Sequence, residues 1–141
     1  MAKLKRTTDL MNELNNTPHI DQYLKDNEEY LIDQSFSKYL CFVIEEKALS
    51  KADIIRKSDI NEIYAYQIFS GKRTPSRNKL LRICVGAEFS LEETNEILKV
   101  AGFSPLFPKI KRDSIIIFGI QNSYSILQIN EELYSHQETT I

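Results

Sequence analysis

The basic side chains between residues 50 and 77 are of the kind that binds phosphate. Four of them, Lys51, Lys72, Arg73 and Arg77, are the candidates for phosphate contacts. Lysine and arginine give proteins affinity for DNA by neutralising backbone phosphates, whereas contacts with base edges give sequence preference. No constellation of nucleophile, base and acid accompanies them in the sequence. The chemistry that this part of the chain indicates is therefore recognition rather than catalysis.

The formal charge of the chain supports this location for a binding surface. The net charge is −2, but it is unevenly distributed. Residues 35–83 hold ten Lys or Arg and five Asp or Glu, a net charge of +5. Residues 1–34 have a net charge of −3 and residues 84–141 a net charge of −4. A charge of +5 is also common on solvated helices. It therefore supports a binding surface only where it coincides with a recognisable pattern of helices.

The elements that must position these side chains are two short helices joined by a tight turn. The pattern predicts helices over residues 51–57 and 61–70. Ser50 and Asn61 can cap them by accepting backbone N–H bonds. Gly71 suits the left-handed conformation that ends many helices, and Pro75 cannot continue one. This is a helix-turn-helix, whose second helix is narrow enough to enter a DNA major groove.

The spacing resembles that of the Cro/C1-type repressors, or XRE family, over about residues 36–87. The matching positions are Ser50, Ile54, Ile55, Asp59, Ile60, the helix from Asn61 to Ser70, Gly71-Lys72-Arg73 and Pro75-Ser76. Asp59 stands where the family usually has glycine, and Phe69 where it usually has an acidic residue. The resemblance implies a repressor-like five-helix core and binding to double-stranded DNA.

The resemblance also implies roles for individual residues. The phosphate-binding positions are Ser50, Lys51, Lys72, Arg73 and Arg77. The base-reading positions are Glu62, Ile63, Tyr66 and Gln67. At these places Glu62 could accept a hydrogen bond from cytosine N4, Ile63 could contact a thymine methyl group, and Gln67 could pair with adenine.

Two interpretations of this helix stay open at the level of sequence. Glu62 is also a favourable carboxylate for the first turn of any helix. Tyr64, Tyr66 and Phe69 are equally suited to packing against neighbouring helices. The first interpretation is a transcriptional regulator that reads duplex DNA through residues 61–70. The alternative is a protein-interaction module, built on the helix-turn-helix fold, that binds no specific DNA site.

The whole chain is predicted to be all-α, in three parts. Residues 1–34 form an N-terminal helical arm, residues 35–88 the helix-turn-helix domain, and residues 89–141 a C-terminal helical extension. In the arm, Thr8 or Asp9 is the expected start of a helix through Asn15, and Thr17-Pro18 the start of a second.

The C-terminal extension contains an internal similarity at an offset of 35 residues. Residues 89–98 align with residues 124–133. Ser90 with Glu93, and Ser125 with Gln128, have the spacing of capping boxes, so we expect two similar helix starts.

The apolar residues Ile115 to Phe118 fit either a helix that begins at Asp113 or Ser114 and continues to Ile120, or a buried strand. We favour the helix because the neighbouring segments are helical. Together with the following helix, this apolar surface is expected to form a homodimer contact, since dimers match paired DNA half-sites.

Other functional classes find little support in the sequence. The chain contains no phosphate-binding glycine loop and no zinc-protease motif, and His19 and His136 have no suitably spaced metal-ligating neighbours. We therefore expect no enzymatic activity, no metal and no cofactor. Cys41 and Cys84 are expected to be reduced, buried thiols.

The longest apolar run covers only residues 115–120, far short of the ~20 residues that span a bilayer. The basic N-terminus is not followed by an apolar stretch of the kind found in secretory signals. We therefore expect no membrane association and a cytoplasmic location.

Overall fold

A computed structural model describes residues 5–31 and 35–141, apart from the side chain of Glu29. These described residues form nine α-helices, one short 3-10 helix and no strand. The prediction of an all-α fold is therefore confirmed. The chain divides into two compact units, residues 1–34 and residues 35–141, which we call the N-terminal and the C-terminal unit.

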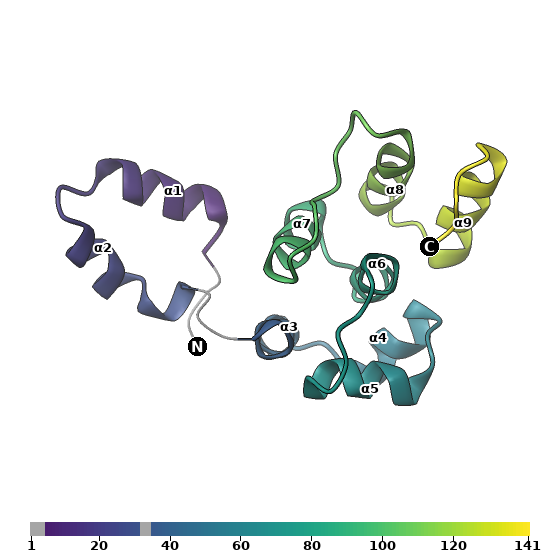
Figure 1. Ribbon diagram of the computed structural model, residues 1–141, viewed down its shortest axis with the longest axis horizontal. Coiled ribbons are helices and arrows are strands. Elements are labelled where there is room, and N and C mark those ends of the chain that lie inside the picture. The colour runs from purple at the N-terminus through teal and green to yellow at the C-terminus, as the bar shows by residue number, and fades with distance from the viewer. Residues whose placement is uncertain (1–4, 32–34) are drawn as a thin grey trace. The chain divides into compact units, whose positions relative to one another are not determined.

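The C-terminal unit is built from seven of the described helices. They are α3 (Phe36–Glu46), α4 (Lys51–Ser58), α5 (Glu62–Ser70), α6 (Arg77–Gly86), α7 (Leu91–Val100), α8 (Lys111–Gln121) and α9 (Ile126–Ser135). Helix α6 is central in this unit, because α4, α7 and α9 all pack against it (Figure 1). Helix α5 packs on α3, and α8 on α9. The predicted division between residues 88 and 89 falls inside this unit, in the short connection from α6 to α7.

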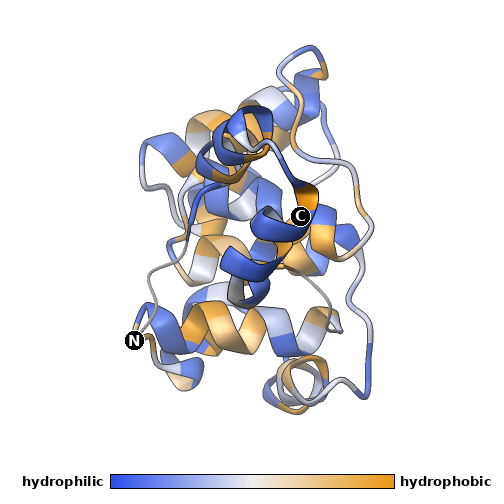
Figure 2. Cartoon of the chain, turned by 90° about the vertical axis from the view of Figure 1, so that its left-hand side faces the viewer, coloured by the Kyte–Doolittle hydropathy of each residue, from blue (hydrophilic) through white to orange (hydrophobic). Residues whose placement is uncertain are grey.

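Apolar side chains from all seven helices form one core. The largest of the fully buried side chains are Leu40, Ile44, Ile54, Ile68, Leu80, Leu81, Ile83, Ile97, Leu98, Ile116, Ile129 and Leu133. Figure 2 shows the corresponding alternation of hydrophobic and hydrophilic residues along the helices. Burying such side chains is the main favourable contribution to folding, at about 25 cal/mol per Å². The C-terminal helices therefore belong to the same core as the predicted helix-turn-helix.

The predicted caps of α4 and α5 are confirmed. The side chain of Ser50 accepts a hydrogen bond from the Asp53 amide at 3.3 Å, and that of Asn61 accepts one from the Tyr64 amide at 3.0 Å. Helix α5 ends at Gly71, whose φ of 86° is in the left-handed region. These caps fix where α4 and α5 begin, and Gly71 fixes where α5 stops.

The C-terminal helices follow the predicted pattern except at one start. Both capping boxes are present, at Ser90 with Glu93 and at Ser125 with Gln128. The segment of Ile115 to Phe118 is helical, as we expected. Helix α8 begins at Lys111, however, so the predicted start at Asp113 or Ser114 is wrong. Asp113 is 3% exposed and accepts a hydrogen bond from the Phe107 amide at 3.0 Å, so it stabilises the preceding loop instead of capping a helix.

The N-terminal unit contains α1 (Thr7–Asn16), α2 (Ile20–Asp26) and the 3-10 helix η1 (Glu28–Tyr30). The first helix starts before Thr8, and the second starts three residues after Thr17, so both predicted starts were slightly wrong. Thr17 donates its hydroxyl to the His19 carbonyl at 3.0 Å instead of capping α2. Asn27 is fully buried and donates to Glu13 at 2.9 Å, and Lys5 donates to both residues.

Candidate nucleic-acid interface

The turn between α4 and α5 places Asp59 in the left-handed region, with φ 52° and ψ 48°. Aspartate tolerates this conformation better than most residues, which explains how it can stand at this position of the turn. Arg82 on α6 supports the turn, because its Nη1 donates to the Asp59 carbonyl at 2.8 Å and to the Ser58 carbonyl at 3.3 Å. The turn is thus tied to the central helix.

Helix α5 presents a continuous exposed stripe. Ile63 is 71% exposed and Tyr66 is 43% exposed, while Glu62 is exposed and Gln67 half-buried. The opposite face of the helix buries Ala65, Ile68 and Phe69. Positions three and four residues apart share one side of a helix, so the four residues predicted to read bases lie together on the outer side of α5.

The aromatic residues of α5 differ in role. Phe69 is 6% exposed, so its main role is packing, and Tyr66 meets its ring edge to face at a centroid distance of 6.1 Å. Tyr64 is half-buried against the core. Of the three, Tyr66 is therefore the one whose ring remains available on the exposed stripe.

Two of the predicted phosphate-binding cations lie against these rings. The Lys51 ammonium is 5.6 Å from the centre of the Phe69 ring, and the Arg73 guanidinium is 5.8 Å from that of Tyr64. Both distances suit cation–π attraction, which holds the charges beside α5. Lys72 is exposed next to Arg73, and Ser50 is exposed at the start of α4. The structure thus brings Lys51 and Arg73 against side chains of α5, with Lys72 beside Arg73 and Ser50 immediately before Lys51.

Arg77 has different partners from those expected. Its guanidinium donates to the Asp113 carboxylate at 3.3 Å and 3.4 Å and to the Ser104 carbonyl at 3.1 Å. The Asp113 side chain is only 4% exposed, and a buried carboxylate requires a partner because its desolvation is costly. Arg77 is therefore the counter-ion of Asp113, and we do not retain it among the phosphate-binding residues.

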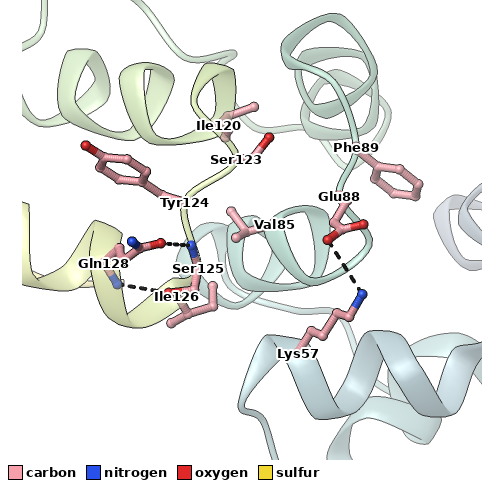
Figure 3. A pocket seen from close by; sticks show the side chains of 10 residues that line it. All are labelled: Lys57, Val85, Glu88, Phe89, Ile120, Ser123, Tyr124, Ser125, Ile126 and Gln128. Atoms are coloured by element: carbon pink, nitrogen blue, oxygen red, sulfur yellow. Dashed lines mark hydrogen bonds and ion pairs between the residues drawn. The ribbon is translucent and has the colours of Figure 1, made fainter.

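A separate pocket of about 490 Å³ lies between the ends of α4, α6 and α8 and the start of α9 (Figure 3). Its apolar wall includes Val85, Phe89 and Ile126, and the ion pair of Lys57 with Glu88, at 3.5 Å, lies at its edge. Both charged side chains are largely exposed, so this pair contributes little to stability. The lining contains no histidine or cysteine and no pair of carboxylates suited to acid–base catalysis.

Sequence reasoning missed the role of Arg82. Its partners are 23, 24 and 59 residues away along the chain, so no local spacing indicates them. The only signal is a charged residue within the otherwise apolar stretch from Leu80 to Val85 in α6.

Within the described residues, no three side chains of His, Cys, Asp or Glu gather as a metal site would require. None of the described helices has the length and apolar character needed to cross a lipid bilayer. Comparison with protein-family models, with curated proteins and with solved structures found no match to this chain.

Proposed function

We propose that this protein is a DNA-binding regulator of transcription that inserts α5 into the major groove of duplex DNA. The observation that carries this proposal is the exposed stripe of Glu62, Ile63, Tyr66 and Gln67 with cations beside it. In this proposal Lys51, Lys72 and Arg73 bind phosphates, together with Ser50, and the stripe contacts base edges. The proposed place of action is the cytoplasm.

The charges that remain available support this assignment. Of the ten cations in residues 35–83, Lys47 is paired with Glu93 at 2.6 Å, and Arg77 and Arg82 are engaged inside the unit. The proposed phosphate contacts use Lys51, Lys72 and Arg73, which form no ion pair among the described residues. Three cations imply a modest affinity that depends strongly on salt.

The salt dependence of binding tests the proposal. Replacing Lys72 and Arg73 together by glutamine should lower the affinity for duplex DNA. It should also flatten the plot of log K against log salt by about two units, because each phosphate contact contributes roughly −0.9. Fluorescence anisotropy at several salt concentrations measures both quantities.

The matched control replaces Lys99 and Lys109 by glutamine. Both are exposed in the C-terminal unit, and the change in net charge is the same. This control should leave the slope almost unaltered. Equal slopes for the two double variants would rule out the proposed phosphate contacts.

A protein-interaction module is the second candidate, and the exposure of Ile63 favours it. An aliphatic side chain that is 71% exposed beside a 43% exposed tyrosine also suits a protein partner. The two candidates differ in a selection experiment. If purified protein enriches no sequence from a random duplex library, while circular dichroism shows it folded, the regulator proposal fails and the interaction module takes its place.

We further propose that the regulator is a homodimer formed through its C-terminal helices. Phe118 on α8, and Leu127 and Tyr134 on α9, are 54%, 67% and 79% exposed. Leu127 and Tyr134 are seven residues apart and so share one side of α9. A two-fold contact through this side would cover apolar surface and pair two copies of α5 for two half-sites.

A further inference from the structure

The backbone of residues 138–141, which we call the strap, is held by side chains of the C-terminal unit. Arg112 on α8 donates to the Thr139 carbonyl at 2.7 Å and to the Thr140 carbonyl at 3.2 Å. Asn130 on α9 holds Ile141 from both sides, since it accepts from the Ile141 amide at 2.8 Å and donates to the Ile141 carbonyl at 3.1 Å. The carbonyls of residues 139, 140 and 141 therefore all have a side-chain donor.

The Ile141 side chain anchors the strap. It is 6% exposed and belongs to the hydrophobic core. Thr139 and Thr140, by contrast, are exposed, so the chain lies across the surface and then turns inward at Ile141. Burial of its apolar surface is favourable, which makes Ile141 the anchor of an otherwise polar segment.

Arg82 connects this anchor to the helix-turn-helix. Its Nη2 donates to the Ile141 carbonyl at 2.8 Å, and its Nη1 donates to the Asp59 carbonyl at 2.8 Å. The Arg82 side chain is 17% exposed; its bond to Ile141 is partly buried, whereas its bond to Asp59 is exposed. The donors of a planar guanidinium point in fixed directions, so the position of one acceptor constrains the position of the other.

We infer that the strap is a conformational lock for the turn between α4 and α5. When the Ile141 side chain is buried, the Ile141 carbonyl accepts the hydrogen bond from Arg82 Nη2. Arg82 Nη1 then fixes the carbonyl of Asp59. That residue has an unfavourable left-handed backbone, so it benefits from an added restraint. When Ile141 leaves, Arg82 loses one acceptor and gains rotational freedom, and the turn that sets the position of α5 loosens. The effect on DNA affinity rests on the proposed function, whereas the effect on the turn does not.

The test is a double variant, Asn130→Ala with Ile141→Ala, compared with the full chain by NMR hydrogen exchange. The amides to follow flank the turn: Asp59, bonded to the Arg56 carbonyl, at the end of α4, and Tyr64 and Ala65, bonded to the side chain and the carbonyl of Asn61, at the start of α5. We expect these amides to exchange at least about fivefold faster, the loss that follows from one weakened restraint. Alanine favours helix more than asparagine, so α9 itself should not be destabilised at position 130.

The matched control is Glu131→Ala, an exposed neighbour on α9, which should leave the turn amides unchanged. Two results would overturn the lock. One is unchanged exchange at the turn although the signals of position 141 show that the strap has left. The other is a strap that stays seated in the double variant. If the turn loosens but DNA affinity is absent in every protein, the lock stands and the proposed function fails.

Discussion

Gln67 is the residue whose proposed contribution to base recognition can be separated from that of the charges. Its side chain is half-buried beside the exposed Ile63 and Tyr66, so only its outer part reaches the surface of α5. A bidentate contact between glutamine and adenine would use its amide group, which has both a donor and an acceptor.

Gln67→Ala should weaken binding to a selected site by about 1–3 kcal/mol, the usual value of such a contact, and leave non-specific binding nearly intact. Lys72→Ala should weaken both kinds of binding alike, because phosphates occur in every sequence. Titration with the selected duplex and a scrambled duplex measures the difference. If Gln67→Ala affects both duplexes equally, Gln67 does not read a base.

Glu93 connects α7 to α3 through a pair of charge-assisted hydrogen bonds. The Lys47 ammonium donates to its two carboxylate oxygens at 2.6 Å and 2.8 Å, and the Ser90 amide donates to it at 2.8 Å. Burial by itself raises the pKa of this carboxyl group, but the bonds from Lys47 and Ser90 outweigh burial. Its pKa in the folded protein is therefore lower than the ordinary 4.5.

A lowered pKa in the folded state means that Glu93 stabilises the protein above the unfolded pKa and loses this contribution as pH falls through the folded pKa. Glu93→Gln keeps the capping box, since glutamine also serves there, but removes the charge. This variant should lower the free energy of unfolding by about 1–2 kcal/mol at pH 7. Below pH 4.5 its stability should fall less steeply than that of the unchanged protein. Urea unfolding from pH 3 to pH 7 measures this. An equally steep acid loss in the variant would exclude Glu93 as its source.

At the scale of helices, the sequence predicts those starts that depend on a local side chain. Ser50, Asn61, Ser90 and Ser125 all accept a bond from a backbone amide three residues later, and their helices begin where expected. Helix α8 lacks such a cap, because Ile110 stands at its start. A start set by the packing of the preceding loop leaves no local signal in the sequence.

The candidate site divides in the same way. The exposed stripe on α5 could be predicted because helical periodicity decides which residues share a side. The pairing of Arg77 with Asp113 could not, since the two residues are 36 positions apart and meet only when the core has formed. Spacing along one helix thus predicts local neighbours, whereas the partner of a long side chain depends on the tertiary fold.

Gly86 allows α4 and α6 to approach closely. A Cβ atom at this position would lie 2.8 Å from the Ile54 carbonyl oxygen and would overlap the Ser58 hydroxyl. The Ser58 hydroxyl itself donates to the Ile54 carbonyl at 2.6 Å, so the crossing is both tight and polar. Only the absence of a side chain lets the two helices meet there.

Gly86→Ala should therefore destabilise the protein by about 1–3 kcal/mol, the usual cost of overpacking. Adding Ser58→Ala should not restore stability, because the carbonyl of Ile54 still opposes the new Cβ atom. Thermal unfolding of the two variants, with Ser58→Ala alone as control, gives the comparison. Full recovery in the double variant would show that only the hydroxyl limits the approach.

At the scale of the whole chain, the two units differ in how they are stabilised. Among the described residues of the N-terminal unit, only Asn27 is buried, and it is held by Lys5 and Glu13. The C-terminal unit instead has one hydrophobic core that extends through α9. Deleting α8 and α9 would expose that core, so truncation cannot test the proposed dimer cleanly.

Surface substitutions on α9 test the dimer instead. Leu127→Glu with Tyr134→Ser should convert a dimer to a monomer, because both side chains are exposed and contribute little to the core. Sedimentation equilibrium measures the mass, and thermal unfolding confirms the fold. Lys99→Gln, which makes the net charge one unit more negative at an exposed position of α7, should keep the dimer. An intact protein that sediments as a monomer at high concentration would remove this proposal.

The reactivity of the buried Cys84 thiol reports whether the core has opened. Cys84 is fully buried in α6, and burial raises the pKa of its thiol to about 12. Only the thiolate reacts with alkylating agents and oxidants, so this sulfur is inert while α6 remains packed. Cys41 is half-buried, so we expect it to react before Cys84 does. The order in which the two cysteines become modified therefore separates local motion near α3 from unfolding of the entire C-terminal unit.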